Sequence, residues 1–397
     1  MTTAAAVDTD APLPRLMLRV SLLYLSLYIH YGFFAFVPLW LKSRGVSSAA
    51  IGALVAIPLI LRILTVAPIA GYVGRRGQVR NAMLVFMLAA AALLVALGMT
   101  SGLAAVVVVM LLFSLAWDQI PVLADAYAVM AVRSQDLDFG RIRVWGSIAV
   151  VAAAAASGWV IGQLHLPVLP YLIAGLLLLP VAVTAWLPTD NRLAGPAEPD
   201  GAAADWRHLL ADRPLLAGML AASLVVGSQG MFNSFSAIQW TAAGISASMI
   251  GLLNATAVVS EIAFFWFGKR LLGHRDPRLM LVIAAVAAAV RWLMMAGSPH
   301  LPLLIVAQLL QGASATGAIL GMMLLIGARA PVRLTSAAQG LNAVLLGVIL
   351  AVITAASGLI WVSGPAVSYA AMAAVALSAL LPLAVLRDRG ARPAAAS

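Results

Sequence analysis

Residues Trp117 to Ser147 read WDQIPVLADAYAVMAVRSQDLDFGRIRVWGS: an apolar helix with two aspartates, a short polar loop and a second helix with arginines near its start. Asp118 and Asp125 share one helical face, about 10 Å apart along the axis at 3.6 residues per turn. Arg143 follows in the second helix. Charged side chains in such apolar surroundings usually face a cavity or a partner charge. This stretch therefore predicts a charged site inside a helical bundle.

The composition places the chain in a membrane. Of its 397 residues, 63% are hydrophobic and 10% are charged, which leaves too little polar surface to cover a soluble protein of this size. Apolar runs long enough to cross about 30 Å of hydrocarbon recur along the sequence, without the alternation typical of barrel strands. Twelve transmembrane helices are expected, at residues 16–41, 47–71, 81–99, 103–131, 143–163, 168–187, 215–240, 247–267, 279–297, 301–328, 337–360 and 365–386.

The predicted fold class is an all-α integral membrane protein with two pseudo-symmetric six-helix bundles. Lysines and arginines favour the cytoplasmic side of membranes. Apart from Arg62 and Arg291, which lie deep within the expected spans, all but Lys42 and Arg44 fall on or near one side when the N-terminus is placed inside. Both termini are therefore expected in the cytoplasm. The expected parts are a cytoplasmic tail (1–15), a first bundle (16–187), a cytoplasmic linker (188–214) with a short helical turn at 206–211, a second bundle (215–386) and a cytoplasmic tail (387–397).

This topology explains the net charge of +10, so no nucleic-acid partner is expected. The sequence has no cysteine, and its five histidines lack the spacing of zinc ligands. We therefore predict no cofactor and no metal site. The polar start of the chain leads into a full-length helix, which predicts that no signal peptide is removed.

An internal repeat relates the two halves. Residues 45–54, GVSSAAIGAL, recur as 244–253, GISASMIGLL, at an offset of 199. Such repeats are typical of transporters. The same offset superposes Arg62 on Glu261, which predicts a charge of opposite sign at equivalent depth in each half.

Aromatic residues mark one face of the first helix. Tyr24, Tyr28 and Tyr31 stand at i, i+4 and i+7, with His30 beside them as a candidate proton-coupling group. Tyrosines on one face can line a wet cavity, stacking a solute on their rings and bonding it through their hydroxyl groups. Helix packing and interfacial anchoring are the alternatives for the tyrosines, and packing against a neighbouring helix is the alternative for His30.

Three acids within the expected spans can be matched with three bases. The acids are Asp118, Asp125 and Glu261, and the bases are Arg62, Arg143 and Arg291. Two interpretations stay open: pairs that only secure helix contacts, or proton-coupling groups whose ionisation responds to a bound solute. Polar amides that could bond hydroxyl groups occur in the second half, at Gln229, Asn233, Gln308 and Gln311.

The segment Gly71–Arg80, GYVGRRGQVR, is a basic, glycine-bearing turn after the second helix. It resembles the loop between helices two and three of the major facilitator superfamily, whose pattern usually has an aspartate at the position of Gly74. The resemblance implies the major facilitator fold and a gating role for Arg75 and Arg76. Arg62, within the preceding helix, is a candidate charge-pair partner of Asp118.

A closer resemblance is to the phenylpropionate permease group of this superfamily. It is carried by KSRGVSSAAIGALVAIPLILRI (42–63), FGRIRVWGS (139–147) and the pair Arg291–Trp292. Lactose permease, a more distant relative, has a glutamate at Asp125 and an arginine at Arg143, and this pair belongs to its sugar site. It has lysine, histidine and glutamate where this chain has Gln308, Gln311 and Ser314, so a coupled proton must use Glu261, Asp125 or Asp118 here.

These features predict a secondary transporter of the bacterial inner membrane, functional as a monomer and working by alternating access. The resemblance implies proton-coupled uptake of a phenylpropionate-like aromatic acid, with the tyrosines at the ring and Arg143 at the carboxylate. A sugar or nucleoside symporter and an exporter of apolar compounds are the alternatives. A membrane enzyme or sensor is disfavoured, because the sequence has no HExxH, GxSxG or P-loop pattern and no soluble output domain.

Overall fold

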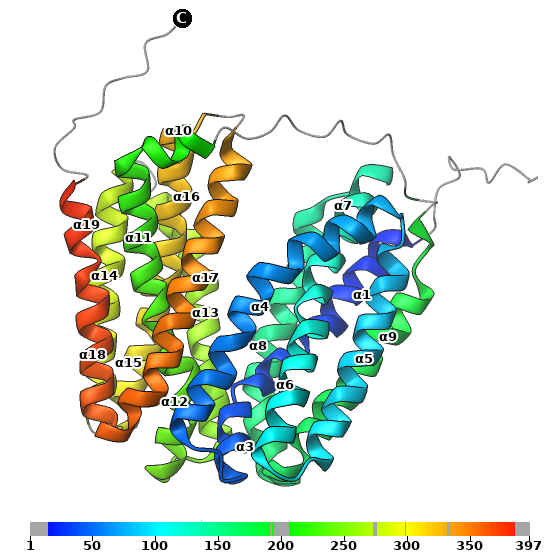
Figure 1. Ribbon diagram of the computed structural model, residues 1–397, viewed down its shortest axis with the longest axis horizontal. Coiled ribbons are helices and arrows are strands. Elements are labelled where there is room, and N and C mark those ends of the chain that lie inside the picture. Colours follow the sequence, from blue (N-terminus) through cyan, green and yellow to red (C-terminus); the bar gives the residue numbers. More distant parts are fainter. Residues whose placement is uncertain are drawn as a thin grey trace, which may run out of the picture. The chain divides into compact units, whose positions relative to one another are not determined.

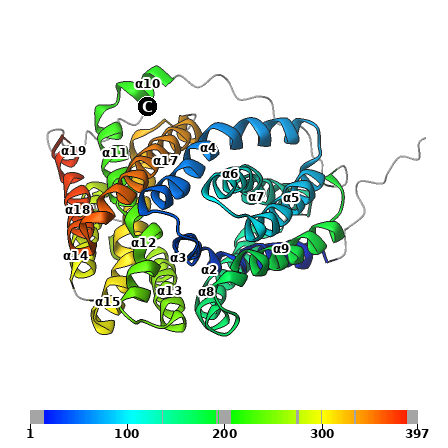
Figure 2. The same ribbon diagram turned by 60° about the horizontal axis from the view of Figure 1, so that its bottom comes forward.

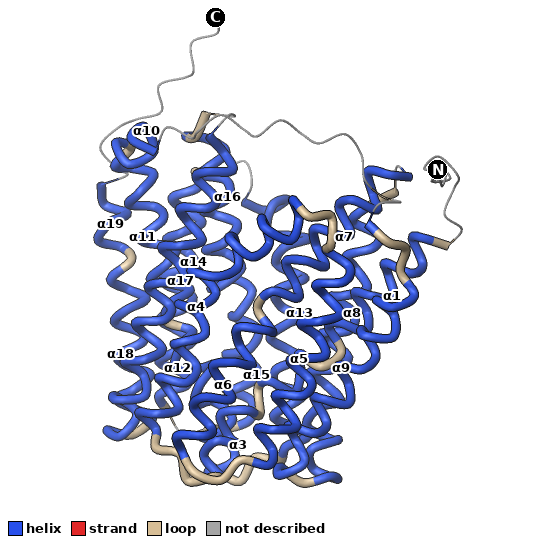
Figure 3. Tube along the Cα trace, turned by 45° about the vertical axis from the view of Figure 1, so that its right-hand side comes forward, coloured by secondary structure: helices blue, strands red, loops and turns tan. Residues whose placement is uncertain are grey.

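The computed structural model describes residues 15–135, 137–190, 193, 206–272, 276–297, 299–331 and 334–385. These residues form helices joined by short loops, with no strand among them (Figure 3). Twelve helical segments are long and apolar enough to cross a membrane, at Leu16–Phe34, Ser48–Arg75, Val79–Met99, Leu103–Gln135, Phe139–Leu164, Leu166–Trp186, Arg213–Ala242, Ala247–Gly268, Pro277–Ala296, Leu301–Arg329, Thr335–Ser363 and Pro365–Ala384. The expected fold class is confirmed.

The expected tails and most of the expected linker lie outside the described residues. The placement of both termini in the cytoplasm stays a prediction. Within the linker, Trp206–Ala211 forms the short helix α10, where the sequence predicts a helical turn.

The chain packs as two compact units. The first contains residues up to Trp40 and Leu61–Asp200, and the second contains Leu41–Ile60 and the residues from Gly201 on. The first unit is built from α1 (Leu16–Tyr28), α2 (Tyr31–Phe34), α5 (Val79–Met99), α6 (Leu103–Trp117), α7 (Gln119–Gln135), α8 (Phe139–Leu164) and α9 (Leu169–Trp186), whereas α3 (Val37–Ser43) and α4 (Ser48–Arg75) contribute residues to both units (Figure 1). Within the first unit, α5 packs along α9, and α1 packs along α8.

The helices of the second unit are α11 (Arg213–Gly227), α12 (Gln229–Ala242), α13 (Ala247–Leu272), α14 (Pro277–Ala296), α15 (Leu301–Gln311), α16 (Gly317–Arg329), α17 (Thr335–Ile360), α18 (Pro365–Ser378) and α19 (Leu380–Val385). Within this unit, α14 packs along α18, as Figure 2 shows, and α11 packs along α17. The boundaries expected for the two bundles stay a prediction.

The internal repeat is visible in the backbone. Gly45 and Gly244 both have a positive φ, of 77° and 81°, and each is followed by a helix, α4 or α13, that begins three residues later. The Gly45 N–H donates to the Lys42 carbonyl, and the Gly244 N–H donates to the Thr241 carbonyl, again at an offset of 199. A left-handed residue that closes a helix favours glycine, which explains why this residue type recurs at both positions.

Several membrane-crossing segments are interrupted where the sequence places polar residues. The break between α6 and α7 lies at Asp118, because Pro121 has no N–H to donate to the Trp117 carbonyl one turn earlier. The break between α11 and α12 lies at Ser228, beside Gly227. A π-helical segment, η3 (Gly312–Thr316), separates α15 from α16. Such interruptions are frequent at functional sites.

Gly32 allows a close approach of α2 to α8. A Cβ at this position would overlap the backbone of Ala153 and Ala154 on α8. Gly32→Ala should therefore force the helices apart and lower stability by about 1–3 kcal/mol, measured as a fall in the thermal unfolding midpoint of the detergent-purified protein. Gly162→Ala is the matched control, because a Cβ at Gly162 of α8 meets open space. Equal midpoints for the two variants would contradict the close contact.

Candidate functional site

The three tyrosines of the first membrane-crossing segment form a stack in the first unit. The ring centroids of Tyr24 and Tyr28 are 6.0 Å apart, and those of Tyr28 and Tyr31 are 4.9 Å apart. Tyr24 donates its hydroxyl hydrogen bond to Asp125 Oδ1 at 2.5 Å. Arg143 Nη1 donates to the Tyr28 hydroxyl at 2.7 Å. The structure thus brings together five of the residues expected in the substrate site.

Asp125 and Arg143 do not form a direct ion pair in this arrangement. Each binds a different tyrosine, and the guanidinium carbon of Arg143 lies 5.3 Å from the Tyr24 ring centroid and 5.1 Å from that of Tyr28. The opposite charges therefore interact at longer range across the tyrosine stack. Since the Arg143 side chain is exposed, its guanidinium can still take an anionic group from outside the protein.

His30 lies beside this stack, enclosed by aromatic rings. It is fully buried, with its ring centroid 4.6 Å from that of Trp117 and 5.5 Å from that of Phe34. Neither imidazole nitrogen has a hydrogen-bond partner among the described residues. The packed arrangement matches the structural alternative for His30, and its proton-coupling role stays a prediction.

Asp118 and Arg62 form a second charged group in the first unit. Asp118 is half-buried at the break between α6 and α7, and its Oδ2 is buried without a hydrogen-bond partner among the described residues. Arg62, in the middle of α4, is exposed and close enough to interact electrostatically with the Asp118 carboxyl. No ion pair within 4.0 Å joins these two described residues.

In the second unit, Arg291 is fully buried and bound by neutral oxygens. Its Nε donates to the Ala307 carbonyl at 3.0 Å, its Nη1 to Gln229 Oε1 at 2.8 Å and its Nη2 to Gln308 Oε1 at 3.2 Å. The guanidinium also stacks on two rings, 4.5 Å from the Phe232 centroid and 4.4 Å from the Trp292 centroid. These groups replace the water and counter-ion that a buried cation would otherwise need.

Glu261 and Arg291 are each bound by a different glutamine side chain of helix α15. Gln311 Nε2 donates to Glu261 Oε1 at 2.7 Å, while Gln308, one turn earlier, accepts from Arg291. Each of these two charges is thus bound by a glutamine, Gln308 presenting its oxygen to the cation and Gln311 its nitrogen to the anion. Asn233, in contrast, is exposed on α12.

Two residues near Arg291 were not identified from the sequence. Phe232 stacks on the guanidinium, and the fully buried Tyr369 of α18 interacts with it electrostatically. Tyr369 is a polar residue in an apolar helix, and that contrast is the one signal that could have singled it out. Phe232 has no such signal, because phenylalanine is ordinary in a membrane helix.

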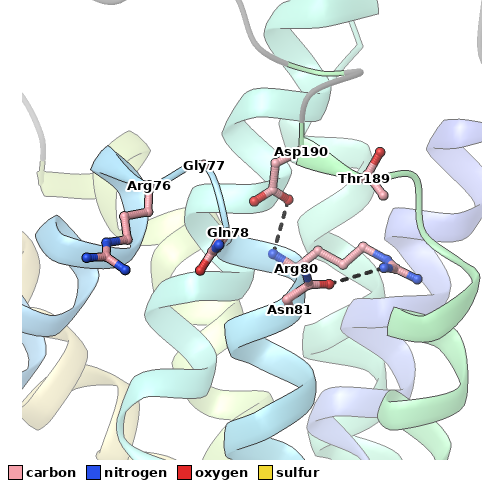
Figure 4. A pocket seen from close by; sticks show the side chains of 7 residues that line it. All are labelled: Arg76, Gly77, Gln78, Arg80, Asn81, Thr189 and Asp190. Atoms are coloured by element: carbon pink, nitrogen blue, oxygen red, sulfur yellow. Dashed lines mark hydrogen bonds between the residues drawn. The ribbon is translucent and has the colours of Figure 1, made fainter. Parts of the chain in front are cut away.

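The basic turn after α4 borders a polar pocket of about 260 Å³ (Figure 4). Arg76 stacks on the Tyr72 ring, 4.6 Å from its centroid. Asp190 Oδ1 accepts from the Arg80 backbone N–H at 3.1 Å and so caps the start of α5, while Arg80 Nη2 donates to the Ala185 carbonyl at the end of α9 at 2.6 Å. Burial raises the pKa of the Asp190 carboxyl, against backbone hydrogen bonds that lower it. These contacts tie α5 to α9, whereas the gating role of Arg75 and Arg76 stays a prediction.

Comparisons with known proteins match this chain to membrane transporters. The MFS_1 like family matches residues 17–371. The chain is 30% identical over 345 residues to the probable 3-phenylpropionic acid transporter of Escherichia coli (strain K12), covering 85% of this chain and 89% of the relative. It is 29% identical over 325 residues to the maltose permease of Geobacillus stearothermophilus, covering 81% of each.

Solved structures show the same fold. The crystal structure of the nucleoside transporter NupG superposes with a TM-score of 0.79, covering 94% of this chain and 100% of that chain at 16% identity. At this identity the likeness concerns the arrangement of helices and not the solute.

Proposed function

The chain belongs to the MFS_1 like family of major facilitator transporters, and on this premise we propose that it takes up a phenylpropionate-like aromatic acid together with protons. It is a transporter of this superfamily and not an enzyme, and a multi-pass protein of the bacterial inner membrane with a small-molecule substrate. The solute, the coupling ion and the direction of flux form the proposal. Alternating access of a site to the two sides of the membrane is the mechanism typical of such repeats.

The observation that carries the proposal is the position of Arg143 against the tyrosine stack. The guanidinium fork offers paired donors to a carboxylate, and one of its nitrogens is already held by Tyr28. The partly exposed rings of Tyr28 and Tyr31 provide aromatic surface for the ring of the same solute, whereas the ring of Tyr24 is fully buried. A molecule with a carboxylate a few bonds from an aromatic ring matches both features at once.

A sugar or nucleoside is the second candidate, and the name of the maltose permease supports the sugar. It would rely on the amides of the second unit. Gln229 and Gln308 are buried and have their carbonyl oxygens engaged by Arg291, so they offer less to a hydroxyl-rich solute than the sequence suggests. Export of apolar compounds is the third candidate, and no described contact favours it over the acid.

The proposal is tested by transport into vesicles. Protein reconstituted into liposomes should accumulate radiolabelled 3-phenylpropionate when the outside is more acidic, and adding the acid outside should acidify the lumen. Maltose and uridine are the comparison solutes, and a protonophore should abolish accumulation. Accumulation that persists after the proton gradient collapses would refute proton coupling, and transport of maltose or uridine in place of the acid would refute the substrate class.

A further inference from the structure

Arg62 is a charged residue in the middle of a membrane-crossing helix that has no hydrogen-bond or ion-pair partner among the described residues. Its side chain is exposed on α4, although a guanidinium in hydrocarbon is costly. The exposed side of Arg62 must therefore meet water or a solute. A structural helix contact alone does not explain why a charged guanidinium occupies this position, because no described group pairs with it.

The groups around Arg62 belong to the site already described. The Tyr31 hydroxyl interacts electrostatically with Arg62, Arg143 and Asp118, so both arginines lie near one tyrosine of the stack. Gln119, the residue after Asp118, donates from Nε2 to Thr65 Oγ1 at 3.2 Å, one turn from Arg62 on α4. This bond holds the helix break against α4 and keeps Asp118 near Arg62.

Of the two acids within the membrane-crossing helices of this unit, Asp118 is the one with a buried oxygen that lacks a hydrogen-bond partner among the described residues. Asp125 receives the Tyr24 hydroxyl, whereas the buried Oδ2 of Asp118 has no donor among the described residues. A buried carboxylate oxygen without a donor is costly, so the ionised form depends on the nearby positive charge of Arg62. Two further titratable groups face this break: Tyr31 interacts electrostatically with Asp118, and the His30 ring packs against Trp117. Asp125 lies two turns further along α7, and Arg143 of α8 interacts with the same tyrosine.

We propose that Arg62 is a second anchor for the substrate carboxylate and that Asp118 is the proton-binding group coupled to it. A carboxylate held by Arg143 also engages Arg62 near Tyr31. Asp118 then loses its counter-charge and binds a proton from water at its carboxyl, so that the acid and one proton are carried together. The inference rests on the proposed function, because it takes the acid as substrate.

The experiment separates binding from proton coupling. Purified wild type, Asp118→Asn, Arg62→Gln and the control Arg141→Gln are compared in two assays: equilibrium exchange of labelled 3-phenylpropionate at equal pH on both sides, and accumulation driven by a pH gradient. Arg141 suits the control because it is two residues from Arg143 on the same helix and pairs with Asp138 at the exposed helix start rather than with the tyrosine stack. Asp118→Asn should retain measurable exchange of the acid and lose gradient-driven accumulation. Arg62→Gln should weaken the apparent affinity about 30-fold or more in both assays.

Binding at different pH gives an independent readout. The affinity of the wild type for 3-phenylpropionate should rise as the pH falls, because protonated Asp118 no longer competes for Arg62, whereas Asp118→Asn should bind with little pH dependence. The inference is overturned if Asp118→Asn still accumulates the acid down a proton gradient, or if Arg62→Gln binds like Arg141→Gln. If the wild type neither binds nor exchanges the acid, the proposed function fails, and this inference fails with it. A fold defect in a variant is recognised by its thermal midpoint and by rescue of binding in Arg62→Lys.

Discussion

Replacing Arg143 by lysine should lower the apparent affinity for 3-phenylpropionate about 10- to 100-fold while leaving the protein folded. Lysine keeps the charge but presents a single ammonium group, so it cannot hold a carboxylate through paired donors. The substitution also removes the planar guanidinium that lies over the Tyr24 and Tyr28 rings. Initial rates of uptake into proteoliposomes over a range of substrate concentrations measure the effect.

Arg141→Lys is the matched control for this substitution. Arg141 stands two residues earlier on α8, and its side chain is 76% exposed in a surface pair with Asp138. Exposed pairs contribute little, so its uptake should change by less than about twofold. Unchanged affinity in Arg143→Lys would remove Arg143 from the substrate site, and with it the main support for an acid as substrate.

The hydrophobic pattern was enough to predict the fold. Residues 81–99 are expected to form one membrane-crossing helix, and α5 covers Val79–Met99. The prediction agrees closely because the thickness of the hydrocarbon sets the length of an apolar run. The repeat also holds at the level of single atoms. Ser47 Oγ accepts from the Ala50 N–H, and Ser246 Oγ accepts from the Met249 N–H, so the recurring sequence builds the same helix start twice.

The partners of the charged residues could not be predicted in the same way. A helical period indicates which residues share a face, but it does not indicate how the faces of separate helices meet. Asp125 and Arg143 were expected to pair, and the structure places tyrosine hydroxyl groups next to each of them. The glutamines of α15 are candidates for bonding a hydroxyl-rich solute, and the sequence does not indicate that Gln308 bonds Arg291 and Gln311 bonds Glu261 in the structure.

The helix interruptions are a further limit of sequence analysis. Pro121 gives a direct reason for the break at Asp118, so this one is visible in the sequence. The π-helical segment after Gln311 has no comparable marker in GASAT. Its start depends on contacts between helices: the Gly312 N–H donates to Ser260 Oγ of α13 at 3.0 Å, and the same hydroxyl donates to the Gln308 carbonyl.

Replacing Arg291 by lysine should destabilise the second unit by about 2–5 kcal/mol. The guanidinium reaches three oxygens in different directions, on Ala307, Gln229 and Gln308, and it stacks on two rings. An ammonium group at the same place can meet fewer of these acceptors, so a buried charge and buried oxygens would both lose partners. The thermal unfolding midpoint of the purified protein in detergent should fall by several degrees.

Arg329→Lys provides the control for this effect. Arg329 pairs with Asp212 at 3.0 Å, but its side chain is 35% exposed, so water can replace lost contacts and the change should stay within about 1 kcal/mol. Gln229→Leu, which removes one acceptor and leaves Arg291 charged, should lower the midpoint in the same direction as Arg291→Lys. If Arg291→Lys unfolds at the temperature of Arg329→Lys, the neutral oxygens do not stabilise the buried charge. Glu261, the remaining acid near Arg291, would then have to balance this charge.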